Sequence, residues 1–343
     1  MAFLPTISTF FSILCFSIVF CLSSSHWFGV WLGLELNMIS FIVLSMSEKS
    51  LNSSESAIKY FLLQALGSGL FVLGSCLSYA SSGSWLISSL SGPDSLLILS
   101  GLGLKLGAAP FHFWVPSVMN SLSWYNALVL SSLQKIAPLL FILVLFPNFS
   151  MLFMLILSAS GALVGGIGGL NQTQILALLG YSSIGHLGWI MGLSLVSLYF
   201  SIFYFLLYLI TVTVVFCLLK TFNTNKVKSF SLKEKMNSSM QVPFFICLLS
   251  LGGLPPLLGF FPKMVGFKLL SENLFSFLLG LLILGSLMSL FYYLNLFFNS
   301  YMSSMSAQKQ SEMFLVSNFN SLLSALTVIF CLSGLMFMEI FSF

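Results

Sequence analysis

The amino-acid sequence predicts an all-α, polytopic membrane protein, a bundle of about eleven transmembrane helices. Three observations support this prediction. The chain of 343 residues is 58% hydrophobic and only 6% charged, whereas soluble domains carry about a quarter charged residues. Its mean hydropathy is +1.06. Apolar runs of about twenty residues, the length that a helix needs to cross a bilayer, recur along the whole chain.

The apolar runs give the expected helices in chain order. We expect spans near 4–23, 26–46, 57–80, 95–115, 124–146, 150–170, 174–194, 198–220, 242–270, 274–298 and 318–340. Most connections are short, so neighbouring helices must run antiparallel and pack within one transmembrane domain over residues 1–343. The segments long enough to be loops are 47–56, 81–94, 221–241 and 299–317.

The basic residues predict the orientation of the chain, and all of them are lysine. With the N-terminus inside, the inner loops and span ends collect most of them: Lys49, Lys59, Lys220, Lys226, Lys228, Lys233, Lys235 and Lys309. The outer side then has only Lys268. Because inner loops are enriched in lysine and arginine, the N-terminus is predicted on the cytoplasmic or matrix side. The net charge of +4 therefore reflects topology, and no nucleic-acid partner is expected.

Three other features are better explained by a retained helix or by packing than by processing or ligand binding. Residues 3–22 lack a basic stretch and a small-residue cleavage site, so we expect a retained helix rather than a targeting segment. Gly161, Gly165 and Gly169 are spaced four apart, the pattern that lets membrane helices approach closely. The six cysteines include no CxxC pair and are expected as core residues.

Three charged residues stand near the middle of predicted spans: Glu35, Lys105 and Lys135. Each such charge costs about 2.5–3.5 kcal/mol unless it faces another charge or water. We therefore expect Glu35 to pair with a lysine. A pair that only fixes helix register is the alternative, but it does not account for a second lysine. Because desolvation disfavours a buried ammonium, lysine in such a place can take up and release protons.

Two histidines extend this polar set. His112 follows the proline of "LGAAP", and His186 lies in "YSSIGHLGW" beside the hydroxyls of Tyr181, Ser182 and Ser183. Each histidine is either a proton carrier or a hydrogen-bonded packing residue, and the sequence favours neither. Lys135 precedes Pro138 by three residues, and this proline leaves one helix carbonyl without its usual donor.

A Leu-Gly-x-x-Pro pattern occurs twice, as "LGAAP" at 106–110 and "LGGLP" at 251–255. The copies lie five spans apart, and an odd shift reverses orientation. This predicts a five-helix unit over 1–147, an inverted five-helix unit over 148–298, and a loop with a last helix over 299–343. Each copy should break its helix, as in transporters built from inverted repeats. We expect the first break to free backbone carbonyls and to make room for water beside Lys105. A chance match is the alternative.

The second copy brings its own lysine, Lys263, directly after Pro262. Along the chain, Lys263 comes after the second predicted break, whereas Lys105 comes before the first. The alternative for Lys263 is a lysine that extends its charged end to the interface from a helix end.

Several motifs occur in a familiar order: "SSHWFGVWLGLELNM" (24–38), "ESAIKYFLLQA" (55–65), "KLGAAPFHFWVP" (105–116), "QKIAPL" (134–139), "GGLNQTQ" (168–174), "YSSIGHLGW" (181–189) and "LGGLPPLLGFFPK" (251–263). With these motifs the chain resembles the mitochondrial NADH dehydrogenase subunit 2 family, antiporter-like membrane subunits of respiratory complex I. The resemblance runs from about residue 24 to about residue 298.

The resemblance implies a function and roles for four residues. The family couples quinone reduction elsewhere in NADH:ubiquinone oxidoreductase to proton translocation, and its animal members have eleven spans. Glu35 would be the carboxylate of a Glu–Lys pair, and Lys105 its partner on the first broken helix. Lys135 would be the bridging lysine, and Lys263 the lysine of the second broken helix. The chain departs from many relatives at Ser117, where an acid is common, and at Leu133, where a tryptophan is common.

The resemblance also implies the surroundings of the chain. It places the protein in the mitochondrial inner membrane, with the N-terminus in the matrix and the C-terminus in the intermembrane space. The expected partners are other membrane-arm subunits, including neighbouring antiporter-like subunits, and the lipid bilayer. No redox cofactor is expected on this chain, since NADH, FMN, iron–sulfur clusters and ubiquinone belong elsewhere in the complex. Bound phospholipid is expected.

Two rival functions remain open at the level of sequence. A free-standing cation/proton antiporter would use the same broken helices and lysines. A purely structural membrane subunit would keep the packing glycines but would not need lysines in mid-span.

Overall fold

The structure is a computed structural model, and it describes residues 3–47, 51–87, 93–145, 151–221, 238–255 and 257–307. These residues form helices and connections, with no strand among them, in agreement with the all-α prediction. The helices are α1 (Phe3–Ser23), α2 (Trp27–Met46), α3 (Leu51–Ser82), α4 (Pro93–Leu106), α5 (Trp114–Ser121), α6 (Trp124–Ser131), α7 (Leu133–Leu145), α8 (Met151–Leu170), α9 (Ile175–Ser194), α10 (Leu198–Thr221), α11 (Ser238–Gly252), α12 (Phe260–Glu272) and α13 (Ser276–Ala307).

The helices follow the predicted spans from the first to the tenth. By length and composition, seven helical segments of the described residues can cross a membrane, with α6 and α7 counted together. The predicted eleventh span at 318–340 lies outside the described residues, as does most of the 221–241 loop. Helix α3 begins six residues earlier than its apolar run. An ion pair between Glu55 and Lys59, one turn apart, extends the helix there.

Two spans are broken where the Leu-Gly-x-x-Pro pattern predicts. The first break separates α4 from α5, and the second separates α11 from α12. Each first half ends at a glycine in the left-handed region, Gly107 with φ 68° and Gly253 with φ 82°. In each case the glycine N–H donates to the carbonyl three residues back, and the next N–H donates to the carbonyl five residues back. This is the Schellman motif, in which glycine has no Cβ to oppose a positive φ.

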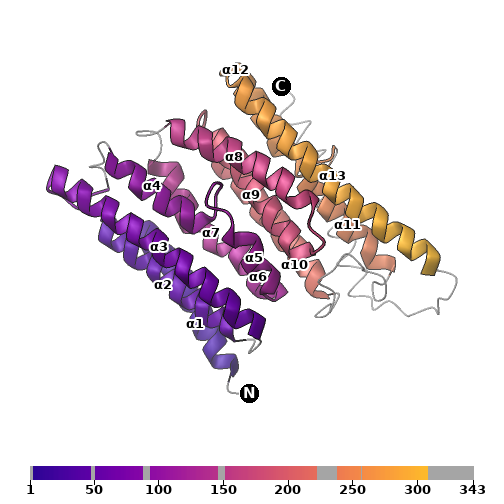
Figure 1. The fold of residues 1–343 in the computed structure, drawn as a ribbon, viewed down its shortest axis with the longest axis horizontal. Helices are drawn as coiled ribbons and strands as arrows, with labels where there is room; N and C mark the ends of the chain where they lie inside the picture. Colours follow the sequence, from indigo (N-terminus) through magenta and orange to yellow (C-terminus); the bar gives the residue numbers. More distant parts are fainter. Residues whose placement is uncertain are drawn as a thin grey trace. The chain divides into compact units, whose positions relative to one another are not determined.

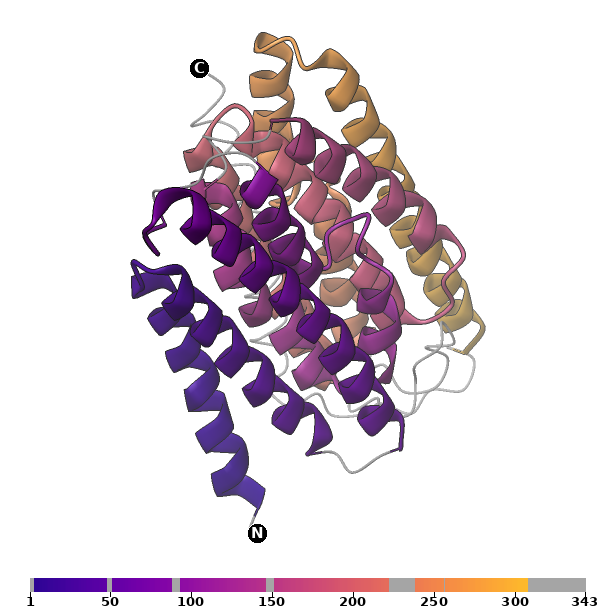
Figure 2. The ribbon, with the colours of Figure 1, turned by 60° about the vertical axis from the view of Figure 1, so that its left-hand side comes forward.

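The chain divides into two compact units between Ser160 and Gly161, within α8. In the first unit α1 packs on α2, α2 on α3, and α3 on α4 and α5 (Figure 1). Figure 2 shows the same succession of α1, α2 and α3 from a second side. Helices α3 and α4 approach closely because Gly67 faces Gly101. A Cβ on Gly101 would lie 2.7 Å from the Gly67 carbonyl oxygen.

In the second unit, α9 packs against α10, α12 and α13, and α11 packs against α10 and α13. The predicted packing role of the α8 glycines is confirmed. A Cβ on Gly161 would lie 3.0 Å from Gly188 Cα, and one on Gly165 would lie 2.5 Å from the Gly185 nitrogen. The residue numbers of the partners rise along α8 and fall along α9, so the two glycine faces meet in an antiparallel crossing.

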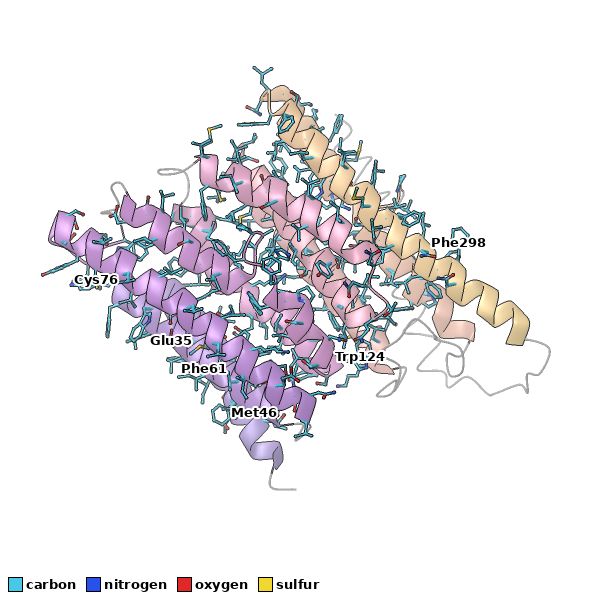
Figure 3. All side chains as sticks on the ribbon, in the orientation of Figure 1. Glu35, Met46, Phe61, Cys76, Trp124 and Phe298 are labelled. Carbon is cyan, nitrogen blue, oxygen red and sulfur yellow. The ribbon has the colours of Figure 1, made fainter. Side chains whose placement is uncertain are left out.

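Large apolar side chains cover the outside of the helices, as a bilayer requires. Met46 on α2, Phe61 on α3 and Phe298 on α13 are exposed and stand out from their helices in Figure 3. The lysines and histidines that the sequence predicts as proton carriers are buried. Glu35, labelled along the length of α2 in Figure 3, is only partly buried.

Candidate functional site

The structure brings Glu35 of α2 and Lys105 of α4 together, as the sequence predicted. Lys105 Nζ lies 3.5 Å from Glu35 Oε1, with side-chain exposures of 3% and 17%. A well-formed bond between an ammonium and a carboxylate measures about 2.7–2.9 Å. The pair is therefore a loose, partly buried ion pair, with its lysine buried and its carboxylate partly exposed.

Two features of the first break position Lys105. Gly67 of α3 leaves room for the stem of Lys105, because a Cβ there would lie 3.1 Å from Lys105 Cγ. Lys105 also lies in the last turn of α4. A cation is stabilised at a helix C-terminus, where the backbone carbonyls carry partial negative charge.

The expectation that the first break leaves free carbonyls was wrong. Gln64 Nε2 of α3 donates to the Lys105 carbonyl at 3.3 Å. Trp114 Nε1 of α5 donates to the Leu104 carbonyl at 3.2 Å. Two N–H groups of the turn itself bond to carbonyls of the last helical turn. Side chains that are distant in sequence thus satisfy this helix end, because an unsatisfied carbonyl in an apolar interior is costly.

A buried network of neutral side chains joins α2, α3 and α7 beside the charged residues. Tyr60 Oη donates to Gln134 Oε1 at 2.9 Å. Gln134 Nε2 donates to Asn37 Oδ1 at 3.0 Å. Asn37 lies two residues after Glu35, and Gln134 directly precedes Lys135. Sequence reasoning missed this network, although its signal was present as amides in the middle of apolar spans.

Lys135 and His112 lie elsewhere in the first unit. Lys135 is buried in α7, three residues after Ser132 interrupts the span between α6 and α7. Ser132 Oγ donates to the Leu128 carbonyl at 2.6 Å, a bond that competes with the helix ladder. His112 lies in the first break, where its Nδ1 is 3.1 Å from the Pro110 carbonyl and its ring packs on Phe113.

In the second unit, Lys263 of α12 is buried and reaches back across its break. Its Nζ donates to the Gly252 carbonyl at the end of α11, at 2.7 Å. Lys105 and Lys263 thus lie on opposite sides of their breaks along the chain. Both place a lysine at the C-terminal end of the first half-helix, where a cation is favoured.

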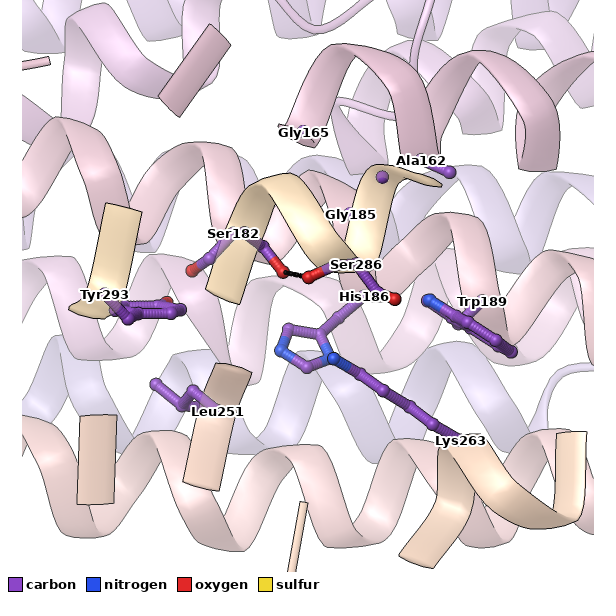
Figure 4. Close-up of a pocket in the computed structure, with 12 residues that line it drawn as sticks. Ala162, Gly165, Ser182, Gly185, His186, Trp189, Leu251, Lys263, Ser286 and Tyr293 are labelled. Atoms are coloured by element: carbon purple, nitrogen blue, oxygen red, sulfur yellow. Dashed lines mark hydrogen bonds between the residues drawn. The ribbon is translucent and has the colours of Figure 1, made fainter. Parts of the chain in front are cut away.

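A small cavity of about 10 Å³ adjoins Lys263, and this volume is at the lower limit for one water molecule. Lys263, His186, Ser182, Ser286 and Tyr293 are among its polar lining residues. Figure 4 shows the imidazole of His186 and the end of the Lys263 side chain directed toward each other at this cavity. The cavity therefore joins a lysine, a histidine and several hydroxyl groups that can exchange protons.

Comparison with known proteins assigns the chain to a family. The family model described as "NADH:quinone oxidoreductase/Mrp antiporter, TM" matches residues 24–285. NADH-ubiquinone oxidoreductase chain 2 of Lumbricus terrestris is 42% identical over 298 residues, 86% of this chain and 87% of the relative. The chain belongs to the NADH-ubiquinone oxidoreductase chain 2 family.

Another chain 2 relative supports the assignment, and a solved structure shows the same fold. The chain 2 protein of Myxine glutinosa is 42% identical over 279 residues, 80% of each chain. A chain in the structure of respiratory complex I from Thermus thermophilus with bound aureothin superposes with a TM-score of 0.79. That match covers 96% of this chain and 78% of the other at 24% identity, and it shows the shared fold. The suspected chain 2 resemblance is thereby confirmed.

Proposed function

We propose that this chain translocates protons as a core subunit of the membrane arm of respiratory complex I. It would couple quinone reduction elsewhere in the assembly to proton transfer across the mitochondrial inner membrane. The observation that carries the proposal is the loose, partly buried ion pair between Glu35 and Lys105. A structural ion pair inside apolar helices gains most from close contact, whereas one that works as a switch must open.

The mechanism is electrostatic. When Glu35 and Lys105 are close, the carboxylate stabilises the ammonium, and Lys105 holds a proton. When they separate, the ammonium remains in an apolar surrounding without its counter-ion and gives up that proton. Lys135 takes the proton in the first unit, and Lys263 is the carrier in the second unit. His112 and His186 are further candidates, of which His186 has the support of a shared cavity with Lys263.

The proposal extends to the surroundings of the chain. The protein would lie in the mitochondrial inner membrane with its N-terminus in the matrix and its C-terminus in the intermembrane space. Its neighbours would be other membrane-arm subunits, antiporter-like ones included. The redox groups would lie elsewhere in the complex, and phospholipid would cover the exposed apolar side chains.

The test is the Lys105→Ala variant in the assembled complex, reconstituted in vesicles, with proton uptake and NADH oxidation measured together. We expect fewer protons pumped per NADH oxidised. Lys59→Ala is the matched control, because Lys59 forms an exposed ion pair on the neighbouring helix α3. If Lys105→Ala pumped as many protons per NADH as Lys59→Ala, the chain would have a structural role and the proposal would fail.

A free-standing cation/proton antiporter is the second candidate, because the matching family model also covers Mrp antiporters. Purification of the tagged chain from its own membranes separates the two functions. A subunit of complex I should be recovered within a large assembly that oxidises NADH. An independent antiporter should be recovered without NADH oxidation, and sodium or potassium gradients should drive proton movement in vesicles that contain it.

A further inference from the structure

His186 separates two small cavities in the second unit. The first is the cavity that it shares with Lys263. The second, also about 10 Å³, is lined by His186 together with Tyr204, Tyr208, Thr211 and Ser250. Each cavity is close to the volume that one water molecule needs, and each offers several polar partners. His186 and Leu251 line both cavities, and of these two side chains only His186 can carry a proton.

Two tyrosines of α10 that line the second cavity contact the imidazole of His186. Tyr204 Oη lies 3.0 Å from His186 Nδ1, which is hydrogen-bond distance. Tyr204 is 1% exposed, so its hydroxyl is fixed inside the protein. The ring of Tyr208, one helical turn further along α10, lies 5.0 Å from the imidazole ring centre. Two tyrosines one turn apart thus fix the position and the tilt of the histidine.

The chemistry of this bond decides what Tyr204 can do. An imidazole exchanges protons through two nitrogens, and the partner of one nitrogen sets the state of the other. Nδ1 lies at the hydroxyl of Tyr204, and the same ring adjoins Lys263 at the first cavity. A hydroxyl can donate to a bare Nδ1, and it can accept from Nδ1–H. The bond therefore persists whether His186 is neutral or protonated.

We propose that Tyr204 is a positioning residue for proton exchange between Lys263 and His186. In this step an N–H bond of the Lys263 ammonium breaks and an N–H bond forms at the unprotonated nitrogen of the neutral His186 ring, so the positive charge moves from lysine to the ring. Tyr204 Oη then accepts a hydrogen bond from Nδ1–H of the buried imidazolium. This inference rests on the proposed function, and it assigns a role to a tyrosine on a helix that carries none of the predicted proton carriers.

The test uses Tyr204→Phe in the assembled complex, because this change removes the hydroxyl and keeps the ring. We expect the rate of proton pumping to fall on the order of ten-fold, by analogy with the lower range of losses when the hydrogen-bond partner of a metal-binding histidine is removed. The control is Tyr292→Phe. Tyr292 is also buried, on α13, but it lines neither cavity. The control should pump at the normal rate.

A double-mutant cycle separates positioning from a structural role. If Tyr204 acts through His186, Tyr204→Phe should lower pumping no further in a His186→Gln background, since residues that act as one unit are not additive. Equal losses in both backgrounds would overturn the inference. Normal pumping by the His186→Gln variant alone would also overturn the inference. This second test does not require that a Tyr204 variant assembles.

One further variant keeps the inference distinct from the proposed function. If Lys263→Ala lowers pumping while Tyr204→Phe behaves like Tyr292→Phe, only the role of Tyr204 fails. If Lys263→Ala and Lys105→Ala both pump normally, the proposed function fails, and the inference fails with it.

Discussion

Individual polar residues beside the ion pair show how the first unit keeps neutral groups in an apolar interior. Gln134 accepts from Tyr60 and donates to Asn37, so one amide joins three helices. An amide relays protons poorly, because it must pass through an unfavourable tautomer. The network is therefore better suited to hold α2 and α7 in register, close to Glu35 and Lys135, than to conduct protons.

Replacement of Gln134 by Leu should destabilise the first unit. The change leaves the hydroxyl of Tyr60 and the side-chain amide of Asn37 without this partner in a buried site, at a cost of about 1–3 kcal/mol. The measurement is the temperature at which the purified complex releases this chain, followed by native electrophoresis. Ser117→Ala is the control, because Ser117 is exposed and bonds only to carbonyls of its own segment. Equal release temperatures for the two variants would contradict this role for Gln134.

At the scale of elements, glycine faces set how closely the helices of the second unit pack. Gly165→Ala should force α8 and α9 apart, since the added Cβ would lie 2.5 Å from the Gly185 nitrogen, a backbone atom that cannot turn aside. Gly280→Ala on α13 is the matched control, because nothing lies within 4 Å of its added Cβ. In a helix interior that change should stabilise by about 0.5–1 kcal/mol.

The measurement for both variants is the amount of the chain that is found in the assembled complex. We expect less of the Gly165→Ala chain in the mature complex than of the wild type, with Gly280→Ala at or above the wild-type level. Similar amounts of both variants would show that α8 and α9 can separate without loss, and that the glycine face is not required for packing.

The two broken helices show how far sequence could predict an element. Periodic hydrophobicity located the spans, and the repeated Leu-Gly-x-x-Pro pattern located both breaks. The structure aligns the second copy one residue later than the pattern does, because Gly107 and Gly253 are the glycines of the two copies that have a positive φ. In that alignment both copies have prolines three and nine residues after the glycine, at Pro110 and Pro116 and at Pro256 and Pro262. The pattern alone could not show this, since "LGGLPP" offers two glycines and two prolines.

The groups that cap each break were beyond the reach of sequence. Pairing of Glu35 with a lysine followed from the cost of isolated charges in lipid. Gln64 and Trp114 donate hydrogen bonds to carbonyls at the first break. These bonds depend on which faces of α3 and α5 point toward the break, and the local sequence pattern does not determine those faces. The bond of Tyr204 to His186 likewise joins two helices that have no distinct apolar face, so hydrophobic periodicity does not orient them.

For the whole molecule, the distribution of lysines gives a prediction about orientation. The segment 221–241 contains Lys226, Lys228, Lys233 and Lys235, whereas Lys268 is exposed near the end of α12. If inner loops are the lysine-rich ones, this segment faces the matrix and Lys268 faces the intermembrane space. A membrane-impermeant amine reagent should therefore modify Lys268 in mitoplasts, in which the outer side of the inner membrane is open, and leave the segment unmodified.

Inside-out particles of the inner membrane should give the opposite result, with modification of the 221–241 lysines and protection of Lys268. The detergent-solubilised complex, open from both sides, is the control for lysines that partner subunits cover, and peptide mass spectrometry reads out each site. Modification of the 221–241 lysines in mitoplasts would reverse the orientation. The lysine-rich surface would then face the positive side of the membrane potential, so the positive-inside bias of this chain would need a cause other than membrane insertion.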